Sequence, residues 1–439
     1  MLKAIKESAK EFIKKTEFKK IRVISHNDSD GITSAAIITK ALQRLGRKFS
    51  LIIVKQLEEE FIRTLPEEEI ILFLDLASNS FNYIKKLKTE VFILDHHEII
   101  SEIPENVTII NPHLFNEEEI SGAGISYLFA RELNDENKDL AYLAVIGMVG
   151  DMLEKNLGKI LQGILNDSKV IVKKGLTLYP ATRPLNKVLE YNSDVYIPGV
   201  TGSNQGTKEF LRENGIGRIG GQFKSIIELD KEEMSKLITA ITLQATNKNG
   251  ASDLIGNIYL INIFNKLEDV RQVSAMLNAC SRLGESGIAI AYALQNKKAK
   301  ESAEVIYAKY KQSLVNALDS LPKLKKIKDK NYLIINAEDK IKDTIIGTIA
   351  SIISNSKEYE EGTAIIAMAY NEDKIKVSAR MVGKNGKNIR EVLNSVIEII
   401  GGEVGGHKFA AGCLVEKSKE AEFIKELKKH LEVELVKIK

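Results

Sequence analysis

Three apolar runs in the first hundred residues each end in side chains that can bind a metal ion. The runs cover residues 21–25, 70–74 and 91–94, and each is typical of a buried strand. In chain order, the polar side chains that follow them are His26, Asp28, Asp30, Asp75, Asp95, His96 and His97. Because ligands of open α/β sheets bind where parallel strands end, we expect a metal site formed by these side chains.

The mixture of side chains indicates which metal is expected. Carboxylates with a minority of imidazoles suit Mn²⁺ or Mg²⁺ better than a zinc site built from soft ligands. His26, Asp28 and Asp30 are spaced i, i+2 and i+4, so an extended or tightly turning backbone can aim all three at one point. Taken alone, this segment is equally typical of an Asx-rich turn that caps a helix beginning at Ile32.

Four further residues gain support as functional candidates from these neighbouring side chains. Asp75, which alone could be a cap or turn residue, ends a central strand and could bridge two ions about 3.5–4 Å apart, as in two-metal hydrolases. His96 and His97 could be structural histidines at a strand edge. An acid and two histidines directly after an apolar run instead favour a role as metal ligand or proton carrier. Asp151 ends the apolar helical pattern of residues 138–150, where the helix dipole disfavours an acid unless a cation is near.

Six other residues are candidates for binding a substrate phosphate, and each has an ordinary structural alternative. They are Asn278, Arg282, Arg380, Gly405, Gly406 and His407. The glycine amides and the histidine lie in a segment, 401–412, that is expected to be a glycine-rich loop; such a loop can hold an anion or simply turn the chain. Arg380, on an expected strand, could bind phosphate through two hydrogen bonds or simply be exposed. Asn278 and Arg282 could contact the substrate or extend from the edge of an apolar core to solvent.

The elements around these residues predict an α/β protein with two lobes. Short apolar strands alternate with helical patterns over residues 21–151, as in a parallel sheet covered on both faces. Two long helical patterns, 269–294 and 300–321, could bridge to a second α/β lobe that begins near Lys330. The expected division is a metal-binding Rossmann-like domain at 1–155, a mostly helical insertion at 156–265, connecting helices at 266–328 and a smaller α/β domain at 329–439.

Composition limits the possible functions. The chain has 439 residues, 44% of them hydrophobic, which favours a globular protein of several domains. Lys and Arg total 63 against 60 Asp and Glu, so the net charge of +3 gives no global basic field and a polyanion must be held by a local patch. Two cysteines without a CxxC argue against a disulfide scaffold and favour a reducing cytoplasm. No signal peptide or membrane span is expected.

These motifs resemble the DHH phosphoesterase family, in the branch that carries a DHH-associated C-terminal domain. The segments that carry the resemblance are SHNDSDG at 25–31, FLDLA at 73–77, LDHH at 94–97, GD at 150–151 and GGEVGGHKFAAG at 401–412. Bacterial RecJ exonucleases often have aspartate at the position of His26, whereas histidine is similar to pyrophosphatases and archaeal members. The length and the LNACSRLG segment at 277–284 most resemble archaeal RecJ-like nucleases.

The resemblance implies a role for each candidate residue. One Mn²⁺, or Mg²⁺, would be held by His26, Asp28 and Asp75, and a second by Asp30, Asp75, His96 and Asp151. Asp95 would support the motif from behind, and His97 would face the scissile phosphate or its leaving group. Arg380 and His407 would bind a phosphate from the second lobe.

The resemblance also implies the function and its alternatives. The first expectation is a two-metal exonuclease that degrades single-stranded DNA or RNA in replication, repair or RNA processing, with replication proteins such as the GINS complex as possible partners. Lysines near the end of the second lobe's hairpin, such as Lys384 and Lys387, are further candidates for backbone contacts. The alternatives are a nano-oligonucleotide hydrolase or small-nucleotide phosphatase, and a non-catalytic replisome scaffold; in the scaffold relatives metal ligands are lost, whereas here every expected position is filled.

Overall fold

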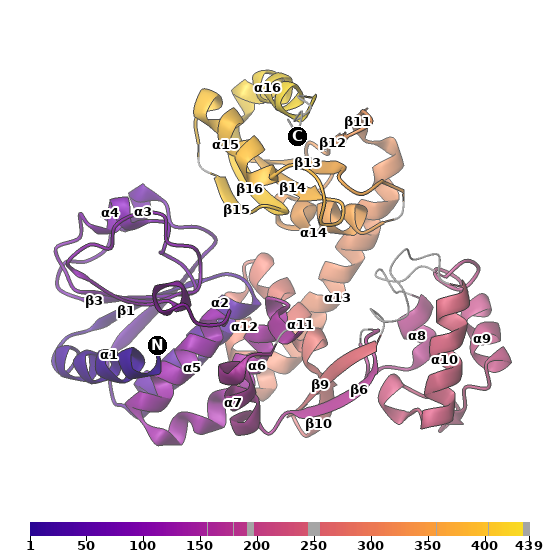
Figure 1. The fold of residues 1–439 in the computed structure, drawn as a ribbon, viewed down its shortest axis with the longest axis horizontal. Coiled ribbons are helices and arrows are strands. Elements are labelled where there is room, and N and C mark those ends of the chain that lie inside the picture. The colour runs from indigo at the N-terminus through magenta and orange to yellow at the C-terminus, as the bar shows by residue number, and fades with distance from the viewer. Residues whose placement is uncertain are drawn as a thin grey trace. The chain divides into compact units, whose positions relative to one another are not determined.

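The computed structural model describes residues 1–155, 157–178, 180–190, 197–244, 255–356, 358–402 and 404–432. The chain divides into two compact units, Met1–Tyr307 and Ala308–Lys439 (Figure 1). Residue 403, in the expected glycine-rich loop, lies outside the described residues. None of the helices within these ranges is long and apolar enough to cross a membrane.

The first unit is built on the predicted parallel sheet. Its five strands are β1 (Ile21–His26), β2 (Phe49–Val54), β3 (Ile70–Leu74), β4 (Val91–Leu94) and β5 (Val107–Ile110). They lie in the order β2-β1-β3-β4-β5, and every neighbouring pair is parallel. All residues of β3 and β4 are buried, which explains why these strands are apolar on both faces.

Helices cover both faces of this sheet, as the alternating pattern predicts. They are α1 (Leu2–Lys15), α2 (Ser29–Arg44), α3 (Glu59–Arg63), α4 (Phe81–Ile84), α5 (Gly122–Leu133) and α6 (Ala141–Gly150). Residues of α3 and α4 pack with Phe73 and Ile93 on one face. On the other face, Phe12 of α1 packs edge-on against Phe92 of β4 and Phe129 of α5, with ring centroids 5.1 and 5.4 Å apart.

The remainder of the first unit contains the insertion and the connecting helices. The elements are α7 (Lys159–Ser168), β6 (Ile171–Leu176), α8 (Leu185–Glu190), α9 (Asn204–Glu213), β7 (Arg218–Ile219), β8 (Gln222–Phe223), α10 (Lys231–Gln244), β9 (Ile255–Ile263), β10 (Lys266–Asp269), α11 (Val270–Arg282) and α12 (Ser286–Ala293). Helix α13 (Lys297–Ser320) begins in the first unit and ends in the second. The antiparallel sheet β10-β9-β6 was not expected from the sequence. The single helix expected at 269–294 is wrong: α11 ends before Gly284, whose φ of +84° stops the helix.

The second unit contains a six-stranded mixed sheet in the order β11-β12-β13-β14-β16-β15. Its strands are β11 (Lys325–Lys328), β12 (Tyr332–Asn336), β13 (Ala364–Asn371), β14 (Lys374–Met381), β15 (Val404–His407) and β16 (Ala410–Glu416), and its main helices are α14 (Asp343–Ser354), α15 (Ile389–Ile400) and α16 (Glu420–Glu432). Residues of α15 and α16 share a core with alternate residues of β14 and β16.

The expected glycine-rich loop is wrong, because most of that segment forms the hairpin β15–β16. Gly405 lies opposite Gly412, and His407 lies opposite Ala410. A Cβ atom on Gly412 would come within 2.8 Å of the Val377 carbonyl oxygen on β14. The glycines therefore allow close approach of neighbouring backbones rather than an irregular loop.

Candidate metal centre

Six predicted metal ligands meet at the carboxyl edge of the parallel sheet. Their positions are the end of β1 (His26), the N-cap and first turn of α2 (Asp28 and Asp30), the residue after β3 (Asp75), the second residue after β4 (His96) and the C-cap of α6 (Asp151). Parallel strands deliver their last residues to one edge, and the N-terminus of α2 starts from the same edge.

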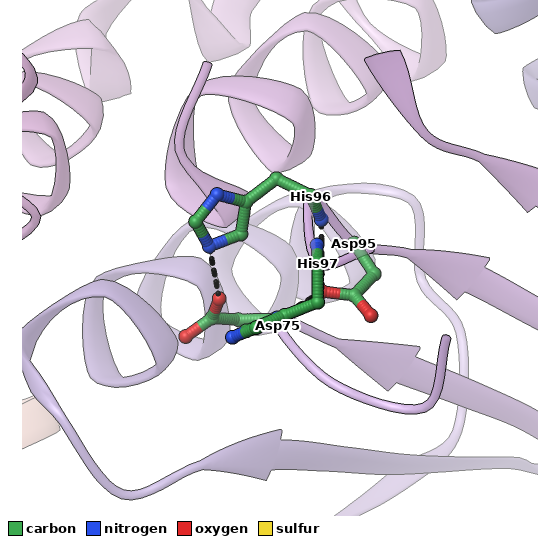
Figure 2. Close-up of side chains that lie close together, drawn as sticks. All are labelled: Asp75, Asp95, His96 and His97. Carbon is green, nitrogen blue, oxygen red and sulfur yellow. Dashed lines mark hydrogen bonds and ion pairs between the residues drawn. The ribbon is translucent and has the colours of Figure 1, made fainter. Parts of the chain in front are cut away.

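Asp75 lies at the middle of the cluster. Its residue adopts a left-handed conformation with φ of +58°, and its side chain is 1% exposed. One carboxylate oxygen lies 3.2 Å from Nε2 of His96, and the other lies 3.5 Å from Nδ1 of His26. Figure 2 shows the approach to His96. Each oxygen of Asp75 therefore faces a different histidine.

The remaining ligands form one group on each side of Asp75. On one side, Oδ2 of Asp28 lies 2.9 Å from Nδ1 of His26, while Oδ1 of Asp28 accepts a hydrogen bond from the Gly31 amide. The N-cap and the metal-ligand interpretations of this segment are therefore geometrically compatible.

On the other side, Nε2 of His96 lies 3.4 Å from Oδ2 of Asp151 and 3.9 Å from Oδ2 of Asp30. Within each of the groups His26–Asp28–Asp75 and Asp30–His96–Asp151, one donor atom per residue lies within 4.8 Å of the others.

Several donor atoms of the cluster lack the partners that burial normally requires. Among the described residues, Nδ1 of His26, both oxygens of Asp75 and Oδ2 of Asp151 are buried without a hydrogen-bond partner. Nδ1 of His26 is within ion-pair distance of Asp28 but forms no hydrogen bond with it. Leaving one such group unsatisfied costs about 1–3 kcal/mol. Oxygen donors with two imidazoles are suitable ligands for hard divalent cations, so these residues fit Mn²⁺ or Mg²⁺.

The charges in the cluster also shift its proton affinities. Burial by itself lowers the pKa of His26 and His96, but the surrounding carboxylates, chiefly Asp28 for His26 and Asp75 for His96, raise both pKa values well above 6.5. Burial and the Asp75 charge raise the pKa of Asp30 to about 7. Burial and the Asp30 charge likewise raise the pKa of Asp151 well above its usual value. The metal-free cluster therefore binds protons that a cation would replace.

Asp95 and His97 form a hydrogen-bonded pair beside this cluster, and one donor atom of each lies within 4.8 Å of donor atoms of Asp75 and His96. Oδ1 of Asp95 accepts a hydrogen bond from the His96 amide at 2.8 Å and lies 2.7 Å from Nδ1 of His97 (Figure 2). Burial raises the pKa of Asp95, but His97, His96 and the Ser78 side chain bring it well below its usual value. The Ser78 amide also donates to Oδ2 of Asp95 at 2.9 Å. Asn111 donates from Nδ2 to the His97 carbonyl oxygen and to Oγ of Ser78. Sequence reasoning missed Ser78 and Asn111, although Asn111 ends the run before Pro112 just as the ligands end theirs.

The candidates on α11 lie in the first unit with the metal cluster. Oδ1 of Asn278 accepts a hydrogen bond at 2.8 Å from the amide of Ser29, the residue between Asp28 and Asp30. Arg282 is half-buried at the last position of α11, one helical turn beyond Asn278.

The other four candidates for phosphate binding lie in the second unit. Arg380 on β14 and His407 on β15 lie opposite the same residue of β16, Ala410, so the three side chains share one face of the sheet. Nε of Arg380 donates to Oγ of Ser351 at 3.0 Å, which fixes the guanidinium. Nδ1 of His407 accepts from the Phe409 amide at 3.3 Å, and burial with the charges of Arg380 and Arg390 lowers the pKa of His407.

Of the basic candidates near 384–387, one lysine has a structural role. Nζ of Lys387 donates to the carbonyl oxygens of His430 and Leu431, both at 2.7 Å. These carbonyls belong to the last turn of α16, which lacks intrahelical donors. Lys387 therefore caps α16, whereas Lys384 is exposed.

Family models match three segments of the chain. The N-terminal domain of the DHH family matches residues 20–148, the DHHA1 domain matches residues 329–433, and the DHH-CID domain matches residues 179–258. The first match contains five of the six predicted ligands and ends three residues before Asp151.

Two curated relatives show how far the sequence similarity extends. An uncharacterized protein of Methanocaldococcus jannaschii is 32% identical over 424 residues, which cover 92% of this chain and 91% of that protein. The single-stranded-DNA-specific exonuclease RecJ of Bacillus subtilis is 28% identical over 171 residues, or 35% of this chain and 22% of the exonuclease. The similarity to this exonuclease thus spans less than a quarter of its length.

Two solved structures share the fold at low sequence identity. RecJ from Thermus thermophilus, in complex with Mn²⁺, has a TM-score of 0.62 at 18% identity, covering 98% of this chain and 55% of RecJ. CDC45 from Entamoeba histolytica has a TM-score of 0.67 at 12% identity, covering 98% of this chain and 99% of CDC45. The fold is therefore shared by an exonuclease, RecJ, and by CDC45.

Proposed function

The chain belongs to the DHH family of phosphoesterases, and we propose that it is a metal-dependent exonuclease that hydrolyses phosphodiester bonds of single-stranded DNA or RNA. The observation that supports this most directly is the convergence of five ligand side chains around Asp75, whose two oxygens are buried and face different histidines. RecJ of Bacillus subtilis is similar in sequence over 35% of this chain, and RecJ of Thermus thermophilus carries Mn²⁺ in a structure of the same fold.

In this proposal the cluster holds two ions. His26, Asp28 and Asp75 would bind one, and Asp30, Asp75, His96 and Asp151 the other, with Asp75 shared. When bound, the two cations supply Lewis acidity that activates water and neutralises charge on the phosphoryl group. Mn²⁺ is the proposed metal, and Mg²⁺ is an alternative with the same ligand preference.

His97 would act on the substrate directly, and Asp95 would hold its ring in place. Asp95 holds Nδ1 of His97, so the other ring nitrogen is available to a substrate. Burial lowers the pKa of His97, but the charge of Asp95 raises this pKa above its ordinary value. A protonated His97 can therefore donate from Nε2 to the scissile phosphate or to the leaving oxygen.

The second unit would hold the substrate by its phosphates. We assign this role to Arg380 and His407 with the amides of Gly405 and Gly406, and in the first unit to Arg282; the sequence alone predicts the same role for Asn278. Because the pKa of His407 is lowered and its Nδ1 accepts a bond, neutral His407 presents an Nε2 donor rather than a charge. Replication proteins such as GINS are proposed as partners on the family resemblance alone.

End-labelled single-stranded DNA and RNA of about 20 nucleotides, each incubated with Mn²⁺ or with EDTA, test this proposal. We expect shortening from one end only with Mn²⁺, and loss of activity by a factor of about 10³ or more in Asp75→Ala. Asp135→Ala is the matched control, because Asp135 is an exposed acid with a 78% exposed side chain outside the cluster. If Asp75→Ala cleaves as well as wild type, the catalytic assignment is wrong.

A dinucleotide substrate distinguishes the alternatives. Equal or faster turnover of a dinucleotide than of the longer strand would identify a nano-oligonucleotide hydrolase. Binding of strands without cleavage under any metal would identify a scaffold instead.

A further inference from the structure

Helix α11 contacts the N-terminus of α2 at Ser29, the residue between two proposed metal ligands. The Ser29 amide donates to Oδ1 of Asn278 at 2.8 Å, and Oγ of Ser274 donates to Oγ of Ser29 at 2.9 Å. Ser29 and Ser274 are 1% and 4% exposed, so the contact between the two serines is shielded from water, whereas Asn278 is partly exposed. We propose that Asn278, supported by Ser274, is a positioning residue that holds the ligand-bearing turn Asp28–Asp30 in its metal-binding conformation.

The contact completes the capping of α2. The first N–H groups of a helix have no partners within the helix. The carboxylate of Asp28 accepts from the amide of Gly31, the third residue of α2, and its other oxygen faces His26. Asp28 therefore does not serve the Ser29 amide, and Asn278 supplies that acceptor from α11. Without it, the first peptide of α2 would lose a restraint placed directly between the side chains of Asp28 and Asp30.

The surroundings leave the turn little freedom to shift. A Cβ atom on Gly150, the last residue of α6, would lie 3.1 Å from Oγ of Ser29 and 3.2 Å from Oγ of Ser274. Three helices therefore meet at Ser29, and α6 continues directly into Asp151. A change at this junction would move ligands that belong to both groups of the cluster.

Helix α11 is itself anchored at its N-terminus. Asp269 caps α11 by accepting from the Arg271 amide, and its other oxygen accepts from the Ala181 amide at 2.8 Å. Nη1 of Arg271 donates to the Thr177 carbonyl oxygen at 2.7 Å. Thr177 and Ala181 are thus bonded to the start of α11, and the metal-ligand turn is bonded to its middle.

This role differs from the phosphate contact assigned to Asn278 from the sequence. Because a backbone N–H only donates, the amide oxygen of Asn278 must face Ser29, and Nδ2 must point elsewhere. A positioning residue acts on the metal ions before any substrate is present. A phosphate contact acts on the substrate and leaves the affinity for metal unchanged.

Calorimetric titration of the full chain with Mn²⁺, without substrate, separates these roles; it assumes, with the proposed function, that Asp28 and Asp30 bind metal. We expect Asn278→Ala to weaken Mn²⁺ binding about tenfold or more, as is usual when a partner of a ligand is removed. Asn278→Asp keeps an oxygen that accepts from Ser29, so it should bind Mn²⁺ at least as tightly as wild type.

The matched control is Gln272→Ala on the same helix. Gln272 is 7% exposed, and its side-chain oxygen accepts from Nε of Arg183 rather than from Ser29. It should retain wild-type affinity for Mn²⁺. Unchanged Mn²⁺ affinity in Asn278→Ala, with a raised KM for the oligonucleotide, would overturn the proposal in favour of a phosphate contact.

Two further measurements cover the remaining cases. If Asn278→Ala does not fold, Ser274→Ala takes its place, and wild-type Mn²⁺ affinity in that variant overturns the proposal. Amide hydrogen exchange at Ser29, measured without metal, reports whether Asn278 restrains the turn that carries the ligands. If the wild type binds no Mn²⁺, the proposed function fails. Faster exchange at Ser29 in Asn278→Ala would still support the positioning role of Asn278, and unchanged exchange would overturn that role.

Discussion

At the scale of single residues, the metal centre depends on two glycines that leave no room for a Cβ atom. A Cβ on Gly147 of α6 would lie 2.2 Å from Oδ1 of Asp30, and one on Gly122 of α5 would lie 2.7 Å from Cβ of Asp75. The amides of Gly122 and Ala123 donate to Asp30 at 2.6 and 3.0 Å. Helices α5 and α6 therefore approach the carboxylates closely enough for backbone groups to orient them.

Gly147→Ala should damage both stability and metal binding. The added methyl group must displace Asp30 or Ala123, so we expect a loss of about 2 kcal/mol of stability and at least about tenfold weaker Mn²⁺ binding. Gly163→Ala is the matched control, because Gly163 lies on α7 with nothing within 4 Å of its Cβ position. That change should stabilise the protein by about 0.5–1 kcal/mol. Urea unfolding and Mn²⁺ titration measure both effects; equal behaviour of the two variants would contradict the argument.

Metal binding should also depend on pH in a defined direction. The pKa of Asp30 is raised to about 7, and the pKa values of His26 and His96 are raised well above 6.5, so the metal-free cluster holds protons near neutrality. A cation binds the deprotonated forms and must displace these protons. We therefore expect Mn²⁺ affinity to increase as the pH rises from about 6 to about 8. Calorimetry in two buffers of different ionisation enthalpy should show release of at least one proton, and no release would contradict the assigned proton affinities.

At the scale of elements, the glycines of the hairpin β15–β16 allow neighbouring backbones to approach closely, so this segment forms strands rather than a loop. Gly406 has φ of +114°, and a Cβ there would lie 2.3 Å from the Ala410 carbonyl oxygen. Gly405 has nothing within 4 Å of its Cβ position. We expect Gly406→Ala to lower stability by about 2–3 kcal/mol, through backbone strain and collision, and Gly405→Ala by less than about 1 kcal/mol. Thermal unfolding of both variants checks this, and a similar loss in the two would mean that the backbone relaxes around the new methyl group.

Much of the fold could be predicted because local pattern and tertiary role agree. The buried strands β3 and β4 are apolar at every position, and the parallel sheet and its covering helices follow from that alternation. Strand β6 could not be predicted from its pattern, since its first four residues, 171–174, are all exposed and include two lysines. The segment 401–412 was misread because glycines that admit a neighbouring strand look the same in sequence as glycines that turn a loop.

The candidate site divides in the same way. The side chains of the metal cluster follow strand or helix ends, and the sequence alone locates them. The groups that hold them, such as the amides of Gly122 and Ala123 that donate to Asp30, come from a distant segment and have no local signature. For Asn278 the sequence marked the residue but suggested a different role, because only the tertiary structure places its oxygen against Ser29.

At the scale of the whole molecule, the nearly neutral charge limits how a polyanion can be bound. With 63 basic and 60 acidic residues, a strand must be held by a few local groups rather than by a broad positive field. Arg282 and Arg380 are the charged members of the proposed phosphate-binding set, because the lowered pKa of His407 favours its neutral form. Binding should therefore neutralise about two phosphates.

This count predicts a shallow salt dependence of strand binding. For single strands the slope of log K against log salt concentration is about −0.7 per phosphate contact, so we expect about −1.4 for this protein and about −0.7 for Arg380→Gln. Both proteins should carry Asp75→Asn, so that the strand is not cleaved during fluorescence anisotropy measurements at several KCl concentrations. A slope steeper than about −4 would show that many more cations contact the strand than the two arginines. An unchanged slope in Arg380→Gln would remove Arg380 from the phosphate-binding set.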